Sequence, residues 1–172
     1  MKAKITLFSI FFVVFSMTVY SQKNDVSKAN QTIADFKATN NKINTFFSTA
    51  YGYAIFPGIG KGGLGVGGAA GKGTVYKAGA AVADCKMTQL TIGFQAGGQK
   101  YAEVVFFENA AAYDRFISNK FEFAAQVSAI AITAGVSLDA EYKDGMLVFT
   151  QGLGGLMYEA SAGGQKFKTE MF

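Results

Sequence analysis

Hydrophobic and polar residues follow three different patterns along the chain, and the first predicts a targeting segment. Residues 5–19 (ITLFSIFFVVFSMTV) form an uncharged, mostly apolar run after Lys2 and Lys4. A basic start followed by such a run is typical of a secretory signal peptide. A helix of this length is too short for a hydrocarbon core of about 30 Å. We expect residues 1–21 to be a cleavable signal peptide ending before Gln22; an uncleaved anchor and a buried core segment are the alternatives.

The second pattern, over residues 22–50, is helical. Apolar residues recur at steps of three, four or seven: Val26, Ala29, Ile33, Phe36, Ile43, Phe47 and Ala50. The segment has no glycine or proline, and Asn24–Asp25 can cap its start. It predicts one long amphipathic helix ending near Thr49, although Asn40 interrupts the apolar stripe. We expect this helix to pack on the rest of the domain, since its polar side mixes charges; a membrane-surface helix is the alternative.

In the third pattern, over residues 51–172, apolar and polar residues mostly alternate, which predicts strands. Strands are predicted over residues 53–56, 88–96, 101–107, 121–127, 129–136, 146–150, 153–162 and 166–169. Turns are predicted at residues 70–73, 83–86, 96–99, 143–145 and 162–165. One short helix is predicted at Glu108–Ser118, with Asn109 as its cap and Ala112, Tyr113 and Phe116 facing inward.

These elements predict an α+β fold. A long N-terminal helix packs on a curled, mainly antiparallel sheet of seven or more strands, with one inserted short helix. Short connections favour antiparallel pairing, and so many strands tend to curl or close into a barrel. The expected organisation is a signal peptide at residues 1–21, an N-terminal helix at 22–50 and a glycine-rich β domain at 51–172.

Composition removes most catalytic interpretations. The chain has no histidine and one cysteine, Cys85. A Ser-His-Asp triad, a histidine-ligated metal and an internal disulfide are therefore excluded. We expect no enzyme activity, no cofactor and no metal site, with Cys85 buried as a small apolar residue. Paired carboxylates among Glu103, Glu108, Glu122 and Glu159 remain an enzymatic alternative, because glycoside hydrolysis needs no histidine.

The net charge gives little support for a nucleic-acid partner. The formal charge of the full chain is +4. Removing residues 1–21 would take away Lys2 and Lys4 but no acidic residue, which lowers the charge to +2. The basic character therefore comes partly from the predicted signal peptide, and we expect no nucleic-acid binding.

All 21 glycines lie between Gly52 and Gly164. Gly58, Gly60 and Gly63 spell G-x-G-x-x-G, but the following residues alternate instead of opening a helix, which argues against a dinucleotide site. Farther along, Gly63, Gly65 and Gly67 share one face of a predicted strand. A bare strand face permits close approach of another backbone, or of a ligand such as a lipid headgroup.

Lysines and tyrosines surround this bare strand. The candidate lipid-binding residues are Lys61, Lys72, Lys77, Tyr51, Tyr53, Gly63, Gly65 and Gly67. Lysine and tyrosine beside accessible backbone amides suit an anionic headgroup, whereas each lysine alone is an ordinary solvated residue.

Several ordered motifs resemble the SYLF-domain family. They are AYGYAIFP at 50–57, GKGGLGVGG at 60–68, LTIGFQAGGQ at 90–99, VVFF at 104–107 and QGLGGLMYEA at 151–160. The resemblance covers about residues 33–167, and Lys61 stands at the family's motif lysine. It implies a lipid-binding module. Eukaryotic relatives bind phosphoinositides and, in yeast, actin; bacterial relatives are exported proteins described as lipid-binding.

The resulting hypothesis is a non-enzymatic, exported protein, periplasmic or secreted, that recognises anionic phospholipid headgroups as a peripheral membrane protein. Phosphoinositide specificity is not carried over, and we do not expect actin binding. The alternatives are an envelope structural or protein-interaction module with an envelope protein as partner, and a small outer-membrane β-barrel. Phe172 at the C-terminus favours that barrel, whereas Glu170 opposes it by interrupting the lipid-facing series.

Overall fold

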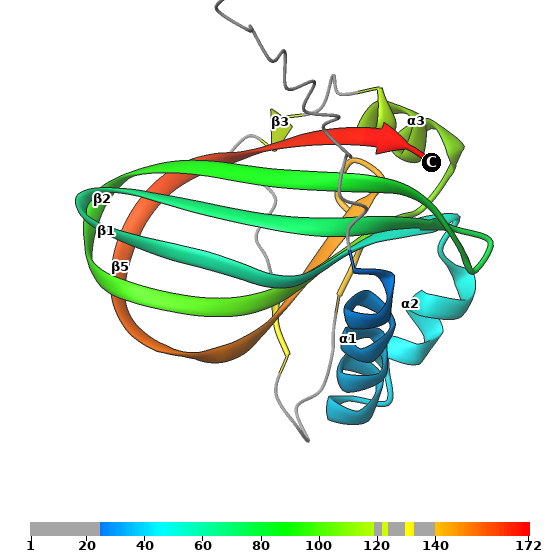
Figure 1. Ribbon diagram of the computed structural model, residues 1–172, viewed down its shortest axis with the longest axis horizontal. Helices are drawn as coiled ribbons and strands as arrows, with labels where there is room; N and C mark the ends of the chain where they lie inside the picture. Colours follow the sequence, from blue (N-terminus) through cyan, green and yellow to red (C-terminus); the bar gives the residue numbers. More distant parts are fainter. Residues whose placement is uncertain (1–24, 119–121, 124–129, 133–139) are drawn as a thin grey trace, which may run out of the picture.

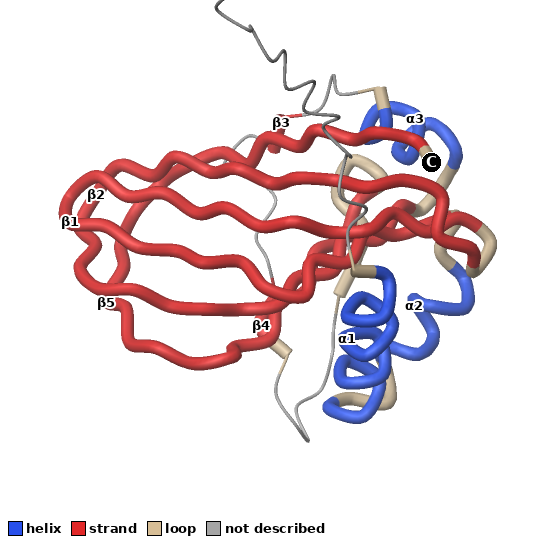
Figure 2. Tube along the Cα trace, viewed as in Figure 1, coloured by secondary structure: helices blue, strands red, loops and turns tan. Residues whose placement is uncertain are grey.

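The computed structural model describes residues 25–118, 122–123, 130–132 and 140–172. Along the chain its elements are α1 (Val26–Thr39), α2 (Ile43–Thr49), β1 (Gly52–Lys77), β2 (Ala80–Phe107), α3 (Ala110–Ile117), β3 (Glu122–Phe123), β4 (Ile130–Ala131) and β5 (Met146–Met171). The helices gather at one end of an elongated sheet, and the strands bend round at the other (Figures 1 and 2). The predicted signal peptide and most of the predicted strands 121–127 and 129–136 lie outside the described residues.

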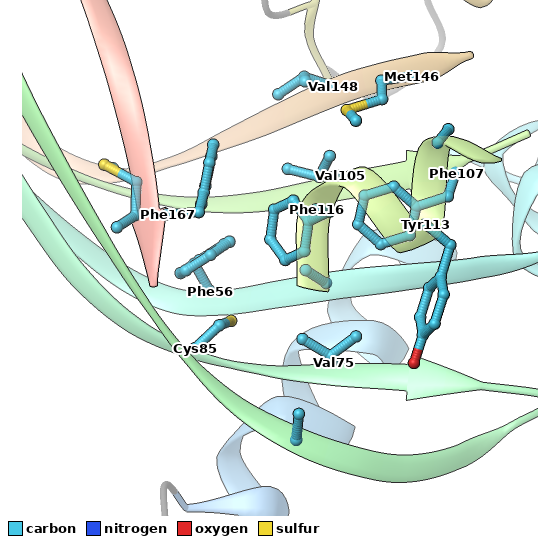
Figure 3. Close-up of a cluster of buried hydrophobic side chains, with 14 of the residues drawn as sticks. Phe56, Val75, Cys85, Val105, Phe107, Tyr113, Phe116, Met146, Val148 and Phe167 are labelled. Atoms are coloured by element: carbon cyan, nitrogen blue, oxygen red, sulfur yellow. The ribbon is translucent and has the colours of Figure 1, made fainter. Parts of the chain in front are cut away.

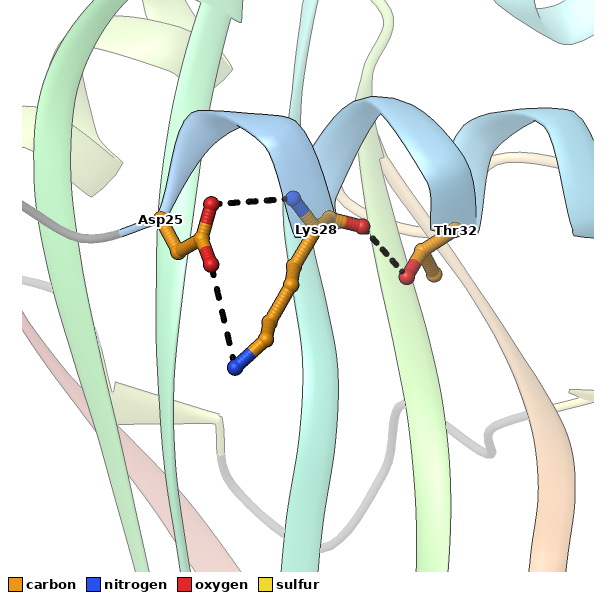
Figure 4. A network of polar contacts seen from close by, with 3 residues as sticks. All are labelled: Asp25, Lys28 and Thr32. Carbon is orange, nitrogen blue, oxygen red and sulfur yellow. Dashed lines mark hydrogen bonds and ion pairs between the residues drawn. The ribbon is translucent and has the colours of Figure 1, made fainter.

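The single helix predicted over residues 22–50 is wrong, because the segment forms two helices. Asp25 caps α1 as expected: its side chain accepts a hydrogen bond from the Lys28 backbone at 3.2 Å (Figure 4). Asn40 has extended backbone angles and accepts a hydrogen bond from the Lys42 backbone at 3.1 Å. An asparagine side chain that bonds the local backbone competes with helical bonding, so the helix stops there. The second helix ends at Thr49, near the predicted end.

The described sheet is mainly antiparallel, as predicted, but it contains five strands rather than seven or more. The strand order is β1-β2-β5-β3, and β4 pairs with β5 in parallel. Because β1 and β3 lie at opposite ends of this order, the described strands form an open sheet and not a closed barrel. The described strands are fewer and longer than predicted because four predicted turns lie inside them. For example, Lys72 pairs with Lys86, and Gln89 pairs with Gln165. The glycines of these stretches are paired across the sheet.

The chain reverses direction at two tight turns with positive φ angles. Ala78 and Gly79 join β1 to β2, and both have positive φ angles (49° and 77°). Asp144 and Gly145 also have positive φ angles (51° and 75°), which confirms the turn predicted at 143–145. Two successive positive φ angles are the signature of the hairpin turn that matches strand twist. The Ala78–Gly79 turn escaped prediction because alanine is rarely the first residue of such a turn.

The long strand β1 folds back on itself around Gly63–Gly67. A Cβ atom at Gly63 would collide with the backbone of Gly67, and one at Gly73 would collide with the carbonyl oxygen of Ile55. The two ends of the strand also meet, because the rings of Tyr53 and Tyr76 stack with centroids 5.1 Å apart. The sheet thereby curls into two layers (Figure 1). Curling was predicted, and glycine permits it by allowing backbones to approach closely.

Two buried clusters hold these layers and helices together. The inner cluster lies between the layers and includes Phe56, Val75, Cys85, Phe116 and Phe167, contributed by β1, β2, β5 and α3 (Figure 3). Burial of Cys85 agrees with the prediction.

The outer cluster packs α1 and α2 against the opposite face of the sheet. It includes Phe36 and Ile43 from the helices and Ile55, Phe106 and Phe149 from the strands. Because Ile55 and Phe56 are neighbours in one strand, they point to opposite faces, and the sheet has a core on each side.

Helix α3 confirms the predicted short helix. The Asn109 side chain caps it by accepting a hydrogen bond from the Ala112 backbone at 3.0 Å. Ala112, Tyr113 and Phe116 face inward, as expected. In the described part of the chain, no helix combines the length and the apolar character needed to cross a membrane.

Candidate functional site

The predicted lipid-binding residues do not gather at one place. Lys77 and Tyr51 lie at the helical end of the molecule, where the Lys77 ammonium is 4.9 Å from the centre of the Tyr51 ring and 5.1 Å from that of Tyr113. A hydrogen bond with Tyr51 raises the pKa of Lys77. Cation–π contact with two rings gives this lysine a packing role beside α3. Its lipid-binding role stays a prediction.

Tyr53 lies in the packing between β1 and the N-terminal helices. Its ring stacks on the Tyr76 ring and forms a T-shaped contact with the Phe47 ring, with the two ring centroids 5.1 Å apart. Burial raises its pKa, and the neighbouring Tyr76 hydroxyl donates a hydrogen bond to Asn30 of α1 at 2.7 Å. These contacts attach α1 and α2 to the sheet, so they account for Tyr53 without a ligand.

Gly63 and Gly67 lie in the bend of β1, with Gly65 between them. Because a Cβ at Gly63 would meet the Gly67 backbone, this position serves a close backbone approach. Of the two uses predicted for this bare strand face, the contact at Gly63 corresponds to backbone packing and not to ligand binding. The neighbouring Leu64 side chain is 84% exposed.

Lys72 belongs to a row of lysines that crosses three strands. It pairs with Lys86 on β2, and Lys86 pairs with Lys168 on β5. All three side chains are exposed. Directly opposed residues in neighbouring strands share a face, so the ammonium groups form a lysine row on the outer side of the sheet. Lys86 and Lys168 were not predicted, because only the register brings them beside Lys72.

Exposed apolar side chains lie on the same layer, nearer the bend. Val66 is 60% exposed and Leu90 is 64% exposed. Val66 lies an even number of residues from Lys72, and Leu90 from Lys86, so both share the outer face with the lysine row. Together with Leu64 they form what we call the apolar patch. On the other side of the row, Asp84 and Glu170 occupy the next paired position.

A second candidate site is a cavity of about 380 Å³ whose lining comes from β1, β2, β4 and β5. Most of its side chains are polar: Lys61, Gln89, Gln99, Tyr101, Glu103 and Gln165. The predicted residue Lys61 therefore lines this cavity, whereas Lys72 lies on the outer face.

Glu103 is the most unusual residue of the cavity. Its carboxyl group is completely buried, and the Gln165 amide donates a hydrogen bond to Oε2 at 3.1 Å. The other oxygen, Oε1, is buried and has no hydrogen-bond partner among the residues that the structure describes. Burial raises the pKa of Glu103 to about 7, an effect that the Gln165 hydrogen bond partly offsets. The sequence drew attention to Glu103 only as one of four scattered carboxylates.

No paired-carboxylate site is formed by the described side chains among those four. Glu103 is the sole acidic residue lining the cavity in the described part of the chain. Glu108 is exposed near Gly145, at the end of β2. The side chains of Glu122 and Glu159 lie outside the described residues. The enzymatic alternative therefore gains no support from the placed carboxylates.

Comparison with known proteins identifies the chain's relatives. Residues 88–169 match the family Ysc84, described as "Las17-binding protein actin regulator". "Beta cell expansion factor A" of Aeromonas veronii is 31% identical over 130 residues, which cover 70% of this chain and 46% of the relative. The chain thus spans about half the length of that curated relative. The matched region carries α3, most of β2 and most of β5, and the motifs quoted above agree with it: residues 88–169 carry a domain of the Ysc84, or SYLF-domain, family.

Proposed function

We propose that this protein binds anionic phospholipid at a membrane surface, through the apolar patch of Leu64, Val66 and Leu90 and the lysine row of Lys72, Lys86 and Lys168. The observation that carries the proposal is that Val66 and Leu90 share one face of the sheet with the lysine row, while the exposed Leu64 lies at the adjoining bend. The SYLF-family domain at residues 88–169, which implies lipid binding, supports the same conclusion. The proposed role is non-enzymatic, and the signal-like residues 1–21 support an exported, peripheral protein.

The patch and the row fit the two parts of a lipid surface. Leu64, Val66 and Leu90 are each at least 60% exposed, so inserting them between lipid headgroups would remove apolar area from water. Each lysine near an anionic membrane contributes about 1 kcal/mol, and the row carries three. Asp84 and Glu170 stand on the far side of the row from the patch, where they need not approach the lipid.

Actin is not part of this proposal. The family description names actin regulation, and the relative's name refers to beta cell expansion. Neither property is transferred to this chain. An exported protein would meet membrane lipid before any cytoskeletal partner. The anionic surface is therefore the partner for which this chain offers complementary charge.

Vesicle flotation tests the proposal directly. Purified protein is mixed at low salt with phosphatidylcholine vesicles, or with vesicles that contain equal parts of phosphatidylcholine and phosphatidylglycerol. We expect flotation with the anionic vesicles and little with the neutral ones. A Lys72→Glu, Lys86→Glu double variant should lose most of it, because both charges are reversed within the row. Lys143→Glu is the matched control, since Lys143 is exposed beside the Asp144–Gly145 turn, outside the row.

Two results would contradict the proposal. One is the absence of flotation with either vesicle while circular dichroism shows a folded protein. The other is equal loss in the double variant and in the Lys143→Glu control, because that would make net charge, and not the lysine row, the determinant.

A further inference from the structure

The cavity that contains Glu103 is separate from the outer surface assigned to lipid. Lys61 and Gln99, which line the cavity, pair with each other on β1 and β2, and the lining residue Tyr101 lies two residues farther along β2. Gln89 and Gln165 pair with each other on β2 and β5 in the other layer. The Glu103–Gln165 hydrogen bond crosses from one layer to the other. The polar groups of this cavity therefore converge from both layers of the curled sheet.

The Oε1 atom of Glu103 indicates that the cavity can accept a hydrogen-bond donor from a ligand. A buried polar atom without a hydrogen-bond partner destabilises the fold, and more so if it is charged. Native proteins therefore satisfy most such atoms. In the described part of the chain, Oε1 of Glu103 has no hydrogen-bond partner, although the residue is fully buried. A donor arriving in the cavity would remove that destabilisation.

The volume and chemistry of the lining limit what that donor can be. About 380 Å³ falls within the usual range of about 300–1,000 Å³ for small-molecule sites. Glu103 opposes an anion such as phosphate, and Lys61 opposes an organic cation. An apolar ligand would leave the amides of Gln89, Gln99 and Gln165 without partners.

A polyhydroxylated group fits all of these constraints. Carboxamides and hydroxyls both donate and accept, as sugar or glycerol hydroxyls do. Thr150 adds a hydroxyl to the lining, and Tyr101 adds an aromatic ring that can face C–H groups. Neighbouring hydroxyls can donate to Glu103 while they accept from the glutamine amides.

We propose that this cavity binds a small polyhydroxylated group, such as a monosaccharide or a glycosyl headgroup, with Glu103 and Gln165 hydrogen-bonded to adjacent hydroxyls. The proposal does not depend on the membrane surface described above. A free sugar and the headgroup of a glycolipid present the same hydroxyls, and the experiment below separates the two sources.

Binding of this kind is linked to the protonation of Glu103. Its pKa is about 7, so the carboxyl is ionised at pH 8 and protonated at pH 6. The other titratable groups around it are Lys61 and Tyr101 in the lining and the Cys85 thiol, whose pKa is raised mainly by burial. Hydroxyl donors favour the ionised carboxylate, so binding should be about tenfold tighter at pH 8 than at pH 6.

The test is titration calorimetry of the full protein at pH 6 and pH 8. The free ligands are glucose, galactose and glycerol. The lipid arm uses phosphatidylcholine vesicles with and without monogalactosyldiacylglycerol. Glu103→Gln should abolish the pH dependence, because it keeps the shape and the hydrogen-bonding capacity but cannot ionise. Glu103→Leu should weaken binding at least tenfold, because it removes the acceptor. Lys143→Gln is the matched control and should bind as the original does, because Lys143 is exposed and lies outside both the cavity lining and the lysine row.

Each outcome has a definite meaning. Saturable binding of a free sugar, or of the galactolipid vesicles alone, supports the cavity and identifies the source. The absence of binding in both arms at both pH values, with the protein folded, overturns the proposal. Binding that is equally strong in Glu103→Leu also overturns it, because the ligand then lies elsewhere. Loss of vesicle flotation in the lysine variants would leave this result unaffected, so the two proposals fail separately.

Discussion

At the scale of single residues, burial decides what Glu103 and the glycines contribute. A carboxyl group without water prefers its neutral form, and at Glu103 one hydrogen bond from Gln165 does not reverse that preference. The surroundings also decide whether a glycine is needed at a given position. Gly73 faces the Ile55 carbonyl and the Phe56 ring, whereas Gly60 faces open space.

Glu103 should make the protein less stable as the pH rises. Its folded-state pKa, about 7, lies above the ordinary value of 4.5, so the native state holds this proton more tightly. Its contribution to stability is complete below pH 4.5 and declines until the pH passes 7. The difference amounts to about 3 kcal/mol. Urea unfolding at pH 5 and pH 8 should show Glu103→Gln gaining stability relative to the original at pH 8 and little at pH 5. An equal effect at both pH values would contradict the assigned burial.

Gly73→Ala should destabilise the fold by about 1–3 kcal/mol, because the new methyl group must displace the backbone and a buried ring. Gly60→Ala is its control: nothing lies within 4 Å of the new atom, and the substitution restricts the unfolded chain, so stability should hold or rise slightly. Thermal unfolding compares the two variants. Equal melting temperatures would mean that the layers do not approach at Gly73.

At the scale of elements, local patterns predicted helices well and strand ends poorly. Asp25 and Asn109 cap helices because side-chain acceptors and exposed amides are neighbours in sequence. Strand ends depend on pairing, which links distant residues. The glycine stretch at 70–73 has the composition of a turn, yet its residues pair across the sheet. Asn40 was only partly predictable. The sequence shows that it interrupts the apolar stripe of residues 22–50, but the end of the helix depends on the hydrogen bond that its side chain accepts from the Lys42 backbone.

The cap of α3 provides a test at this scale. Asn109→Ala removes the acceptor of the Ala112 backbone amide and should cost about 1 kcal/mol in urea unfolding. Asn109→Asp supplies an equivalent acceptor and should restore most of that loss. If both substitutions cost the same, the hydrogen bond to Ala112 is not what stabilises the start of α3.

At the scale of the whole molecule, sequence and structure agree on class and differ on the site. The α+β class followed from the helical and alternating patterns, the antiparallel pairing from the short connections, and the curl from the large number of expected strands. The lysine row and the cavity did not, because both combine residues from three long strands whose register no local pattern reveals. Lys61 and Lys72 were predicted for one site, but the fold separates them into a cavity and an outer face.

Salt should separate the two contributions to membrane binding. Raising the ionic strength screens the lysine row and leaves apolar insertion intact. A Lys72→Gln, Lys86→Gln, Lys168→Gln variant should bind anionic vesicles weakly and with little salt dependence. Leu64→Ser should also bind more weakly but keep the salt dependence of the original. Vesicle co-sedimentation across a salt series measures both. Identical salt slopes in the two variants would exclude the division of roles between row and patch.

The central place of β2 has a consequence for how the chain acquires its fold. The partner on one side, β1, lies immediately before it and joins it through the two-residue turn at Ala78–Gly79. The partner on the other side, β5, follows only after α3 and the segment beyond it. The hairpin can therefore close early, while one edge of β2 stays unpaired over most of its 28 residues until β5 arrives. Such an open edge is a template for wrong pairing between chains. Nascent chains that lack β5 are for this reason the species most exposed to aggregation.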